Sequence, residues 1–197
     1  MRKLLIFFIL FIFSMVSFSG NEVEEYVLEQ HNKIFKFIND SENLLKEDRI
    51  KFLEGLEDVL KDLIISKEIS KRVLGKKNYI IATKKQKNDF DLKFKNTLFD
   101  TYSTALVEID NANITIDSHV HPNERLDLAI VKMSVSVSDT EFDLIYKMKK
   151  IEGKWRVIGI ILDGIDLIAI FRKQFNKLLA DFDGNFDLAI QNWELDS

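Results

Sequence analysis

Apolar residues recur at helical spacing through the first half of the chain. They stand three and four positions apart over residues 22–38, and three polar residues, Asn-Asp-Ser, then interrupt the pattern. A second pattern of the same kind runs over 48–64, and a short third one ends at Gly75, a residue typical of helix ends. The spacing predicts three amphipathic helices before residue 80.

A longer helix is predicted to begin after Thr83. Thr83 and Gln86 have the spacing of a capping box, in which two side chains satisfy free backbone groups at a helix start. Large apolar residues then recur at every fourth position, namely Phe90, Phe94, Leu98, Tyr102 and Leu106. Such an aromatic stripe is ordinarily part of a solid core, and its spacing is equally compatible with the wall of a cavity.

The pattern changes to a period of two in the second half. Short β-rich pieces at 107–109 and 114–116 precede a turn at 119–123. Apolar residues alternate over 129–137 and 142–148, and again after a Glu-Gly-Lys turn at Trp155, Val157, Gly159 and Ile161. The alternation predicts antiparallel strands with one apolar face, joined by tight turns.

Helices are predicted again at the end of the chain. Asp166 is placed to cap a helix over 167–178, and a last short helix follows Asp183 and Gly184. Helices, then a meander of strands, then helices indicate an α+β fold, with a curved, cone-like antiparallel sheet packed with several amphipathic helices.

The first nineteen residues have the pattern of a secretory signal peptide. A cationic start is followed by an apolar run over 4–13, and small residues at Ser17 and Ser19 fit cleavage after Ser19. Residues 1–19 are therefore expected to be removed, leaving 20–197 as a single domain. The chain has no cysteine, so neither disulfides nor a lipid-modified N-terminal cysteine are expected.

Charge argues against nucleic acid as a partner. The chain has 28 basic and 32 acidic residues, and Arg2 and Lys3 leave with the signal peptide, so the expected mature net charge is −6. The basic residues nevertheless cluster at Lys67, Lys71, Arg72, Lys76, Lys77, Lys84, Lys85 and Lys87. This cluster is either a solvated face or a patch that attracts anions.

No metal or catalytic site stands out. His119 and His121 stand two positions apart in a predicted turn, without a third ligand nearby. Asp181, Asp183 and Asp187 surround Gly184, but a calcium loop would need that glycine two positions later. No phosphate-binding loop, nucleophile elbow or zinc-protease motif is present.

Two blocks of sequence resemble the MlaC (toluene-tolerance, Ttg2-type) family. The first is 72–75 (Arg-Val-Leu-Gly) with the capped aromatic stripe, and the second is 153–157 (Gly-Lys-Trp-Arg-Val), 163–165 (Asp-Gly-Ile) and Arg172-x-x-Phe175. Three positions depart from the family pattern. Gly159 occupies a position where the family usually has an aspartate, and Asp166 one where it has a serine. Ala169-Ile170-Phe171 replaces the common Asn-Asn-Tyr. Polar contacts that the family makes at these positions are therefore not carried over to this chain.

The resemblance implies a nuclear-transport-factor-like cone and a periplasmic carrier rather than an enzyme. Its cargo would be a diacyl phospholipid, it would have no cofactor, and it would be monomeric. Its partners would be an inner-membrane ABC transporter with a mammalian-cell-entry domain and an outer-membrane lipoprotein complex, in a pathway that maintains outer-membrane lipid asymmetry.

The resemblance also suggests where lipid would bind. The expected walls of the acyl-chain pocket are Val73, Leu74, Phe90, Phe94, Leu98, Tyr102, Phe142, Leu144, Tyr146, Met148, Trp155, Val157, Ile165, Ile168 and Phe171. A head-group or partner patch is expected at Lys76, Lys77, Lys84 and Lys85. Two alternatives stay open: a cone-fold enzyme using Asp143 or Asp163, and a non-transport interaction module with a solid core.

Overall fold

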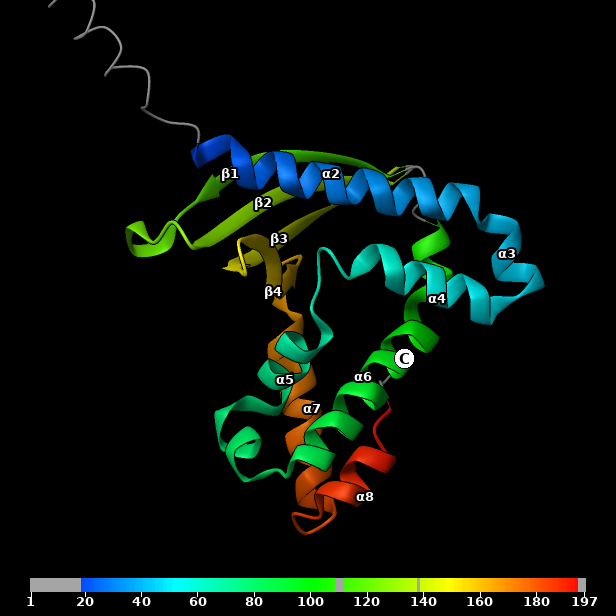
Figure 1. The fold of residues 1–197 in the computed structure, drawn as a ribbon, viewed down its shortest axis with the longest axis vertical. Coiled ribbons are helices and arrows are strands. Elements are labelled where there is room, and N and C mark those ends of the chain that lie inside the picture. The colour runs from blue at the N-terminus through cyan, green and yellow to red at the C-terminus, as the bar shows by residue number, and fades with distance from the viewer. Residues whose placement is uncertain (1–18, 109–111, 138, 195–197) are drawn as a thin grey trace, which may run out of the picture.

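The computed structural model describes residues 19–108, 112–137 and 139–194 (Figure 1). The expected signal peptide lies outside this range except for Ser19, where α2, the first described helix, begins. The elements are α2 (Ser19–Asp40), α3 (Glu42–Glu47), α4 (Arg49–Leu60), α5 (Ser66–Ile81), α6 (Lys84–Glu108), β1 (Asn113–Val120), a 3-10 turn (Pro122–Glu124), β2 (Leu128–Val137), β3 (Thr140–Ile151), β4 (Lys154–Leu162), β5 (Ile165–Asp166), α7 (Leu167–Asp181) and α8 (Phe186–Gln191).

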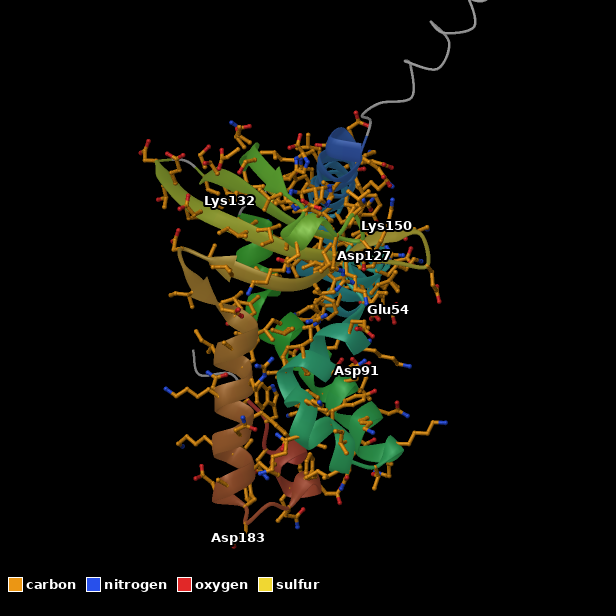
Figure 2. The ribbon with its side chains drawn as sticks, turned by 90° about the vertical axis from the view of Figure 1, so that its left-hand side faces the viewer. Glu54, Asp91, Asp127, Lys132, Lys150 and Asp183 are labelled. Atoms are coloured by element: carbon orange, nitrogen blue, oxygen red, sulfur yellow. The ribbon has the colours of Figure 1, made fainter. Side chains whose placement is uncertain are left out.

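The strands form one antiparallel sheet in the order β1-β2-β3-β4-β5, so the predicted α+β meander is confirmed. Its inner face carries alternate residues of each strand, such as Val131, Met133 and Tyr146, which are buried. Polar residues such as Lys132 lie on the opposite face (Figure 2). The alternation of apolar and polar residues in the sequence therefore matches the alternation of buried and exposed side chains in the sheet.

Because of a β-bulge in β4, the residues of this strand that face inward differ from those predicted. Met148 pairs with Val157 whereas Lys147 pairs with Gly159, so Ile158 is the extra residue. An extra residue inverts the alternation beyond it. Trp155 and Val157 still lie on the inner face, but Ile160, and not the expected Ile161, continues it opposite Tyr146.

Helices α2 and α4 form a hairpin beside the sheet (Figure 1). The buried stripe of α2 (Val23, Val27, Ile34, Ile38) packs against the inner face of the sheet. Gly55 lets α4 approach α2 closely, because a Cβ built at this position would lie 2.6 Å from the ring of Phe37. The capping side chain of this helix is Asp48, which accepts a bond from the Lys51 amide at 3.2 Å.

Helices α5 to α8 form the other half of the molecule (Figure 1). Their core is aromatic: Phe90, Phe94, Phe171, Phe175 and Trp193 contact one another with ring centroids 4.7–6.1 Å apart. These rings are edge-on, tilted or stacked, which are the favourable arrangements for such pairs. The densest part of the predicted stripe therefore fills a solid core.

The predicted caps of α6 and α7 are confirmed. The Thr83 hydroxyl accepts from the Gln86 amide at 3.2 Å, and the Gln86 side chain accepts from the Thr83 amide at 3.0 Å, which is the reciprocal capping box. Asp166 accepts from the Ala169 amide at 3.0 Å. The last helix is capped by Asn185 and begins at Phe186.

Helix α5 differs from its prediction. The backbone at Gly75 has φ 74°, a left-handed value that interrupts the helix, but a second helical stretch then continues to Ile81. Helix α4 in turn ends earlier than predicted, so that Leu63 and Ile64 lie in the linker 61–65. Val107, predicted in a β-rich piece, belongs to the end of α6.

Candidate functional site

A cavity of about 660 Å³ lies between the inner face of the sheet and helices α2, α4 and α6. Its apolar walls come from four helices, four strands and the linker 61–65, and much of its surface is carbon. We call it the central cavity. Its volume falls in the range typical of sites for small organic ligands.

Six of the fifteen residues expected in the pocket line the central cavity. Phe94, Leu98 and Tyr102 lie on one face of α6, and Phe142, Leu144 and Tyr146 lie on the inner face of β3. The structure thus brings together the two seams that the sequence analysis singled out. These seams are the helical stripe from Phe94 to Tyr102 and the inner face of β3.

The other nine do not line the central cavity. Val73, Leu74, Phe90, Ile168 and Phe171 belong to the core among α5–α8, and Met148, Trp155 and Val157 fill the core between the sheet and α2. Ile165 is 51% exposed in the short strand β5. Periodicity identifies the apolar face of an element but not the gaps between elements. These nine residues therefore have the apolar spacing of the cavity wall but lie away from the cavity.

Most of the remaining wall was not predicted. Residues of α2 contribute His31, Ile34 and Phe35, the chain around the linker contributes Leu60, Leu63, Ile64 and Ile65, and the sheet adds Ile114, Val135 and Ile160. The helical period of α2 and α4 already marked Ile34, Leu60, Leu63 and Ile64 as apolar-face residues. Phe35 and His31 carried no signal, because they lie at the flank of the apolar stripe.

One buried polar pair interrupts the apolar wall. The His31 Nε2 atom lies 3.0 Å from the Tyr146 hydroxyl, and both side chains are more than 90% buried. Burial lowers the pKa of His31 from 6.5 to about 4 and raises the pKa of Tyr146 above its ordinary value. Both side chains are therefore neutral at pH 7 and suit an apolar surrounding.

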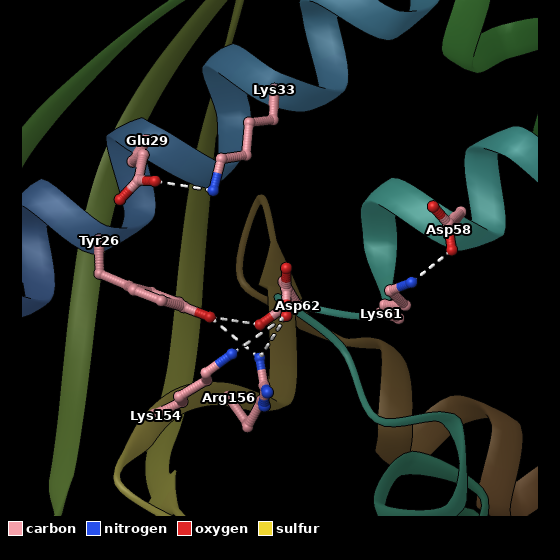
Figure 3. Close-up of polar contacts among 8 residues, drawn as sticks. All are labelled: Tyr26, Glu29, Lys33, Asp58, Lys61, Asp62, Lys154 and Arg156. Carbon is pink, nitrogen blue, oxygen red and sulfur yellow. Dashed lines mark hydrogen bonds and ion pairs between the residues drawn. The ribbon is translucent and has the colours of Figure 1, made fainter.

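The linker 61–65 is held against β4 by backbone and side-chain bonds. The Val157 amide donates to the Leu63 carbonyl at 2.9 Å, which covers part of the open edge of the sheet. The Tyr26 hydroxyl donates to the Asp62 carbonyl and accepts from Arg156 Nη1 at 3.0 Å (Figure 3). Burial raises the pKa of Tyr26, so its hydroxyl stays a donor. We call Tyr26, Asp62 and Arg156 the linker clamp.

Polar residues form the rim of the central cavity where α4, α5 and α6 meet. Lys95 on α6 bonds both carboxylate oxygens of Glu57 on α4, at 2.8 and 2.9 Å. Asp91, labelled in Figure 2, accepts from the hydroxyls of Ser66 and Ser70 at 2.6 and 2.9 Å. Lys61 and Lys67 also line this side. A ligand with an apolar body and a polar end fits this arrangement.

The lysines of the expected patch lie elsewhere. Lys76 and Lys77 line a second, open groove of about 1070 Å³ between α5 and α7, together with Lys71, Arg72, Lys149 and Arg172. Glu68 is the one acidic residue among the described residues that line it. We call it the basic groove. Lys84 and Lys85 are exposed at the start of α6.

The candidate acids for catalysis lie outside the central cavity. Asp143 is exposed on the outer side of β3, and its amide donates to the Asp163 carboxylate at 2.8 Å, a bond that stabilises the turn after β4. His119 contacts Glu24 at 2.5 Å and His121 contacts the Leu128 carbonyl at 2.6 Å. Within the described ranges, no three acidic or histidine side chains gather as a metal site.

Comparison with known proteins gives a consistent result. The family model described as MlaC protein matches residues 29–194. The toluene tolerance protein ttg2D of Pseudomonas putida is 29% identical over 143 residues, which cover 72% of this chain and 66%, just under two thirds, of that protein.

A solved structure has the same fold. It is the phospholipid-binding protein of Ralstonia solanacearum in complex with a phospholipid, with a TM-score of 0.76 and 18% identity over 85% of this chain and 92% of that one.

Proposed function

Because the chain belongs to the MlaC family, we propose that it is a phospholipid carrier that holds acyl chains in the central cavity. The observation that carries the proposal is the cavity itself, a space of about 660 Å³ with apolar walls and a polar rim on one side. Each methylene that leaves water contributes about 0.8 kcal/mol, so acyl chains bind there without a charged partner. MlaC proteins are lipid-binding carriers and not enzymes.

The rim suggests how the cargo is oriented. Acyl chains would extend between the strand face at Phe142 to Tyr146 and the helix face at Phe94 to Tyr102, and the phosphate end would lie near Lys61 and Lys67. Ser66 and Asp91 add hydrogen-bonding groups for the glycerol region. The solved relative that was crystallised with a phospholipid supports this class of ligand.

The proposal extends to place and partners. We place the carrier in the periplasm after removal of residues 1–19, where it would pass lipid between an outer-membrane lipoprotein complex and an inner-membrane ABC transporter with a mammalian-cell-entry domain. Among the helices that the structure describes, none is long and apolar enough to cross a membrane. The alternative, a non-transport interaction module, would carry no bound lipid.

The decisive experiment measures the mass of the bound ligand and tests whether a larger side chain in the cavity excludes it. The protein is purified from periplasm without detergent and examined by native mass spectrometry, where a bound mass equal to a diacyl phospholipid is expected. Leu98→Trp should lower lipid occupancy at least about fivefold, because the larger ring occupies the space of the acyl chains.

Leu92→Trp is the matched control, since Leu92 lies on the same helix and is 57% exposed. Its occupancy should equal that of the wild type. The carrier proposal fails if the wild type has no bound lipid, or if a folded Leu98→Trp protein carries as much lipid as Leu92→Trp.

A further inference from the structure

Two adjacent isoleucines stand in solvent at the end of α5. Ile80 is 68% exposed and Ile81 is 62% exposed. Among the described residues, they are the one pair of sequence neighbours in the set of exposed large apolar side chains. Apolar side chains scattered singly on a surface are ordinary, whereas two neighbours form a small continuous apolar surface.

The two isoleucines lie on a helical turn that is anchored to the rest of the protein. The left-handed backbone at Gly75 turns the second part of α5 away from the first. Its opposite side is anchored, because buried Asn78 donates to Asn176 of α7 at 2.7 Å and Ala82 is 5% exposed. The isoleucines are therefore held outward by packing on the other side of the same turn.

Lysines surround the pair on both sides. Lys76 and Lys77 precede Ile80 and Ile81 by four positions, which places them on the same side of the helical turn. Lys84 and Lys85 follow in the first turn of α6, and all four are exposed. Lys85 is paired with Asp89 at 2.6 Å, and Lys76 and Lys77 also line the basic groove. We call residues 76–85 the α5–α6 tip.

We propose that the α5–α6 tip docks the protein onto an anionic lipid bilayer. Ile80 and Ile81 would enter the boundary between head groups and acyl chains, and Lys76, Lys77 and Lys84 would contact phosphates. This combination of an apolar point and flanking cations is the pattern of interfacial binding. An acidic protein surface would pair with the cations, whereas a bilayer offers both phosphates for the cations and a continuous apolar layer for the two isoleucines.

Part of the α5–α6 tip and part of the cavity wall belong to the same helix. The first part of α5 supplies Ser66, Lys67 and Ile69 to the wall of the central cavity, and its second part carries the tip. One helix therefore connects the proposed membrane contact with the proposed cargo site. The docking proposal itself requires no cargo, so it stands or fails separately from the carrier function.

The test measures binding to vesicles. The mature protein is sedimented with vesicles of equal parts phosphatidylglycerol and phosphatidylcholine, and with vesicles of phosphatidylcholine alone. Binding is expected on the anionic vesicles, and it should weaken in high salt because exposed charges are screened. Ile80→Asp/Ile81→Asp should reduce the affinity at least about tenfold, as should Lys76→Glu/Lys77→Glu.

Ile50→Asp is the matched control, because Ile50 is 72% exposed on α4 and stands outside the tip. It should bind vesicles like the wild type. The proposal is overturned if the wild type does not distinguish the two vesicle types, or if the isoleucine variant binds like Ile50→Asp.

A protein partner is the competing outcome. If the lysine variant loses binding to an acidic periplasmic partner while no form binds vesicles, the tip is a protein-docking surface and the proposal is wrong. Native mass spectrometry of the tip variants keeps the two proposals apart. Cargo should remain bound in them, whereas an empty wild-type protein would overturn the carrier function alone.

Discussion

At the residue scale, the most informative side chain is one that the sequence did not indicate. His31 stands between Gln30 and Asn32 on a helix rich in polar residues, and its pattern resembles a solvated position. Its side chain is nevertheless buried and pairs with Tyr146, which is 115 positions later in the chain. Contacts of this kind depend on tertiary packing, so local periodicity does not report them.

The low pKa of His31 predicts a pH-dependent stability. Between pH 6.5 and about 4 the unfolded chain binds a proton at this histidine and the folded protein does not, so the free energy of unfolding falls as the pH falls through this window. At pH 4.5 this effect amounts to about 2–3 kcal/mol. Urea unfolding at pH 7.5 and pH 4.5 measures the difference.

His31→Phe isolates this contribution, because the variant retains every other titrating group. The loss of stability between the two pH values should be about 2–3 kcal/mol smaller in the variant than in the wild type. An equal loss in both proteins would show that His31 does not stay neutral in the fold.

Gly55 allows a second prediction at this scale. Replacing a glycine inside a helix by alanine ordinarily stabilises a protein by about 1 kcal/mol. Here the added methyl group would meet the Phe37 ring at 2.6 Å, so Gly55→Ala should instead destabilise by about 1–2 kcal/mol. Chemical denaturation measures this, and Phe37→Leu should relieve part of the cost. A stabilised Gly55→Ala protein would contradict the close contact.

At the element scale, the period of most segments predicted their type, although Val107 was assigned to a β-rich piece and lies in α6. Irregularities limited the rest. The capping box at Thr83 and the cap at Asp166 were predictable because they are local bonds between residues three apart. The bulge at Ile158 was not, since it depends on pairing with β3. It moves Ile160 into the cavity wall in place of Ile161.

The linker clamp gives a prediction for one of these irregular elements. Arg156→Met keeps an apolar stem but removes the bond to the Tyr26 hydroxyl and the ion pair with Asp62, so the unfolding free energy should fall by about 1–2 kcal/mol. Hydrogen exchange should become faster at Val157, whose amide donates to the linker.

Lys33→Met is the control for the clamp. Lys33 lies near the clamp (Figure 3), but it makes an exposed pair with Glu29 on the same helix at 2.7 Å. Such pairs contribute little, so the stability of this variant should stay within about 0.5 kcal/mol of the wild type. Equal losses in the two variants would mean that the linker is held by its apolar side chains alone.

At the scale of the whole molecule, fold class followed from the order of periods, but the location of the cavity did not. Phe90 and Phe94 have the same spacing, type and burial, yet Phe94 lines the central cavity and Phe90 lies only in the aromatic core. The difference arises from where α6 passes the end of the sheet. A gap between elements is a property of their arrangement, which a pattern along one chain does not contain.

Removal of bound lipid should destabilise the whole domain. A ligand that binds only the folded state at about a hundred times its Kd contributes about 2.7 kcal/mol, which corresponds to a Tm about 5–11 °C higher for a domain of this size. Calorimetry of the protein before and after delipidation measures the shift, and adding phospholipid back should restore the Tm. An unchanged Tm would mean that lipid does not bind the folded state in preference to the unfolded chain.

The walls of the central cavity come from positions as far apart as His31 and Ile160. Helix α2 lies against the inner face of strands that follow it by about a hundred positions, and β4 completes the wall. A partly synthesised or partly folded chain therefore has no enclosed apolar space to offer. If the chain is the carrier proposed above, lipid would therefore bind only after β4 has completed the wall.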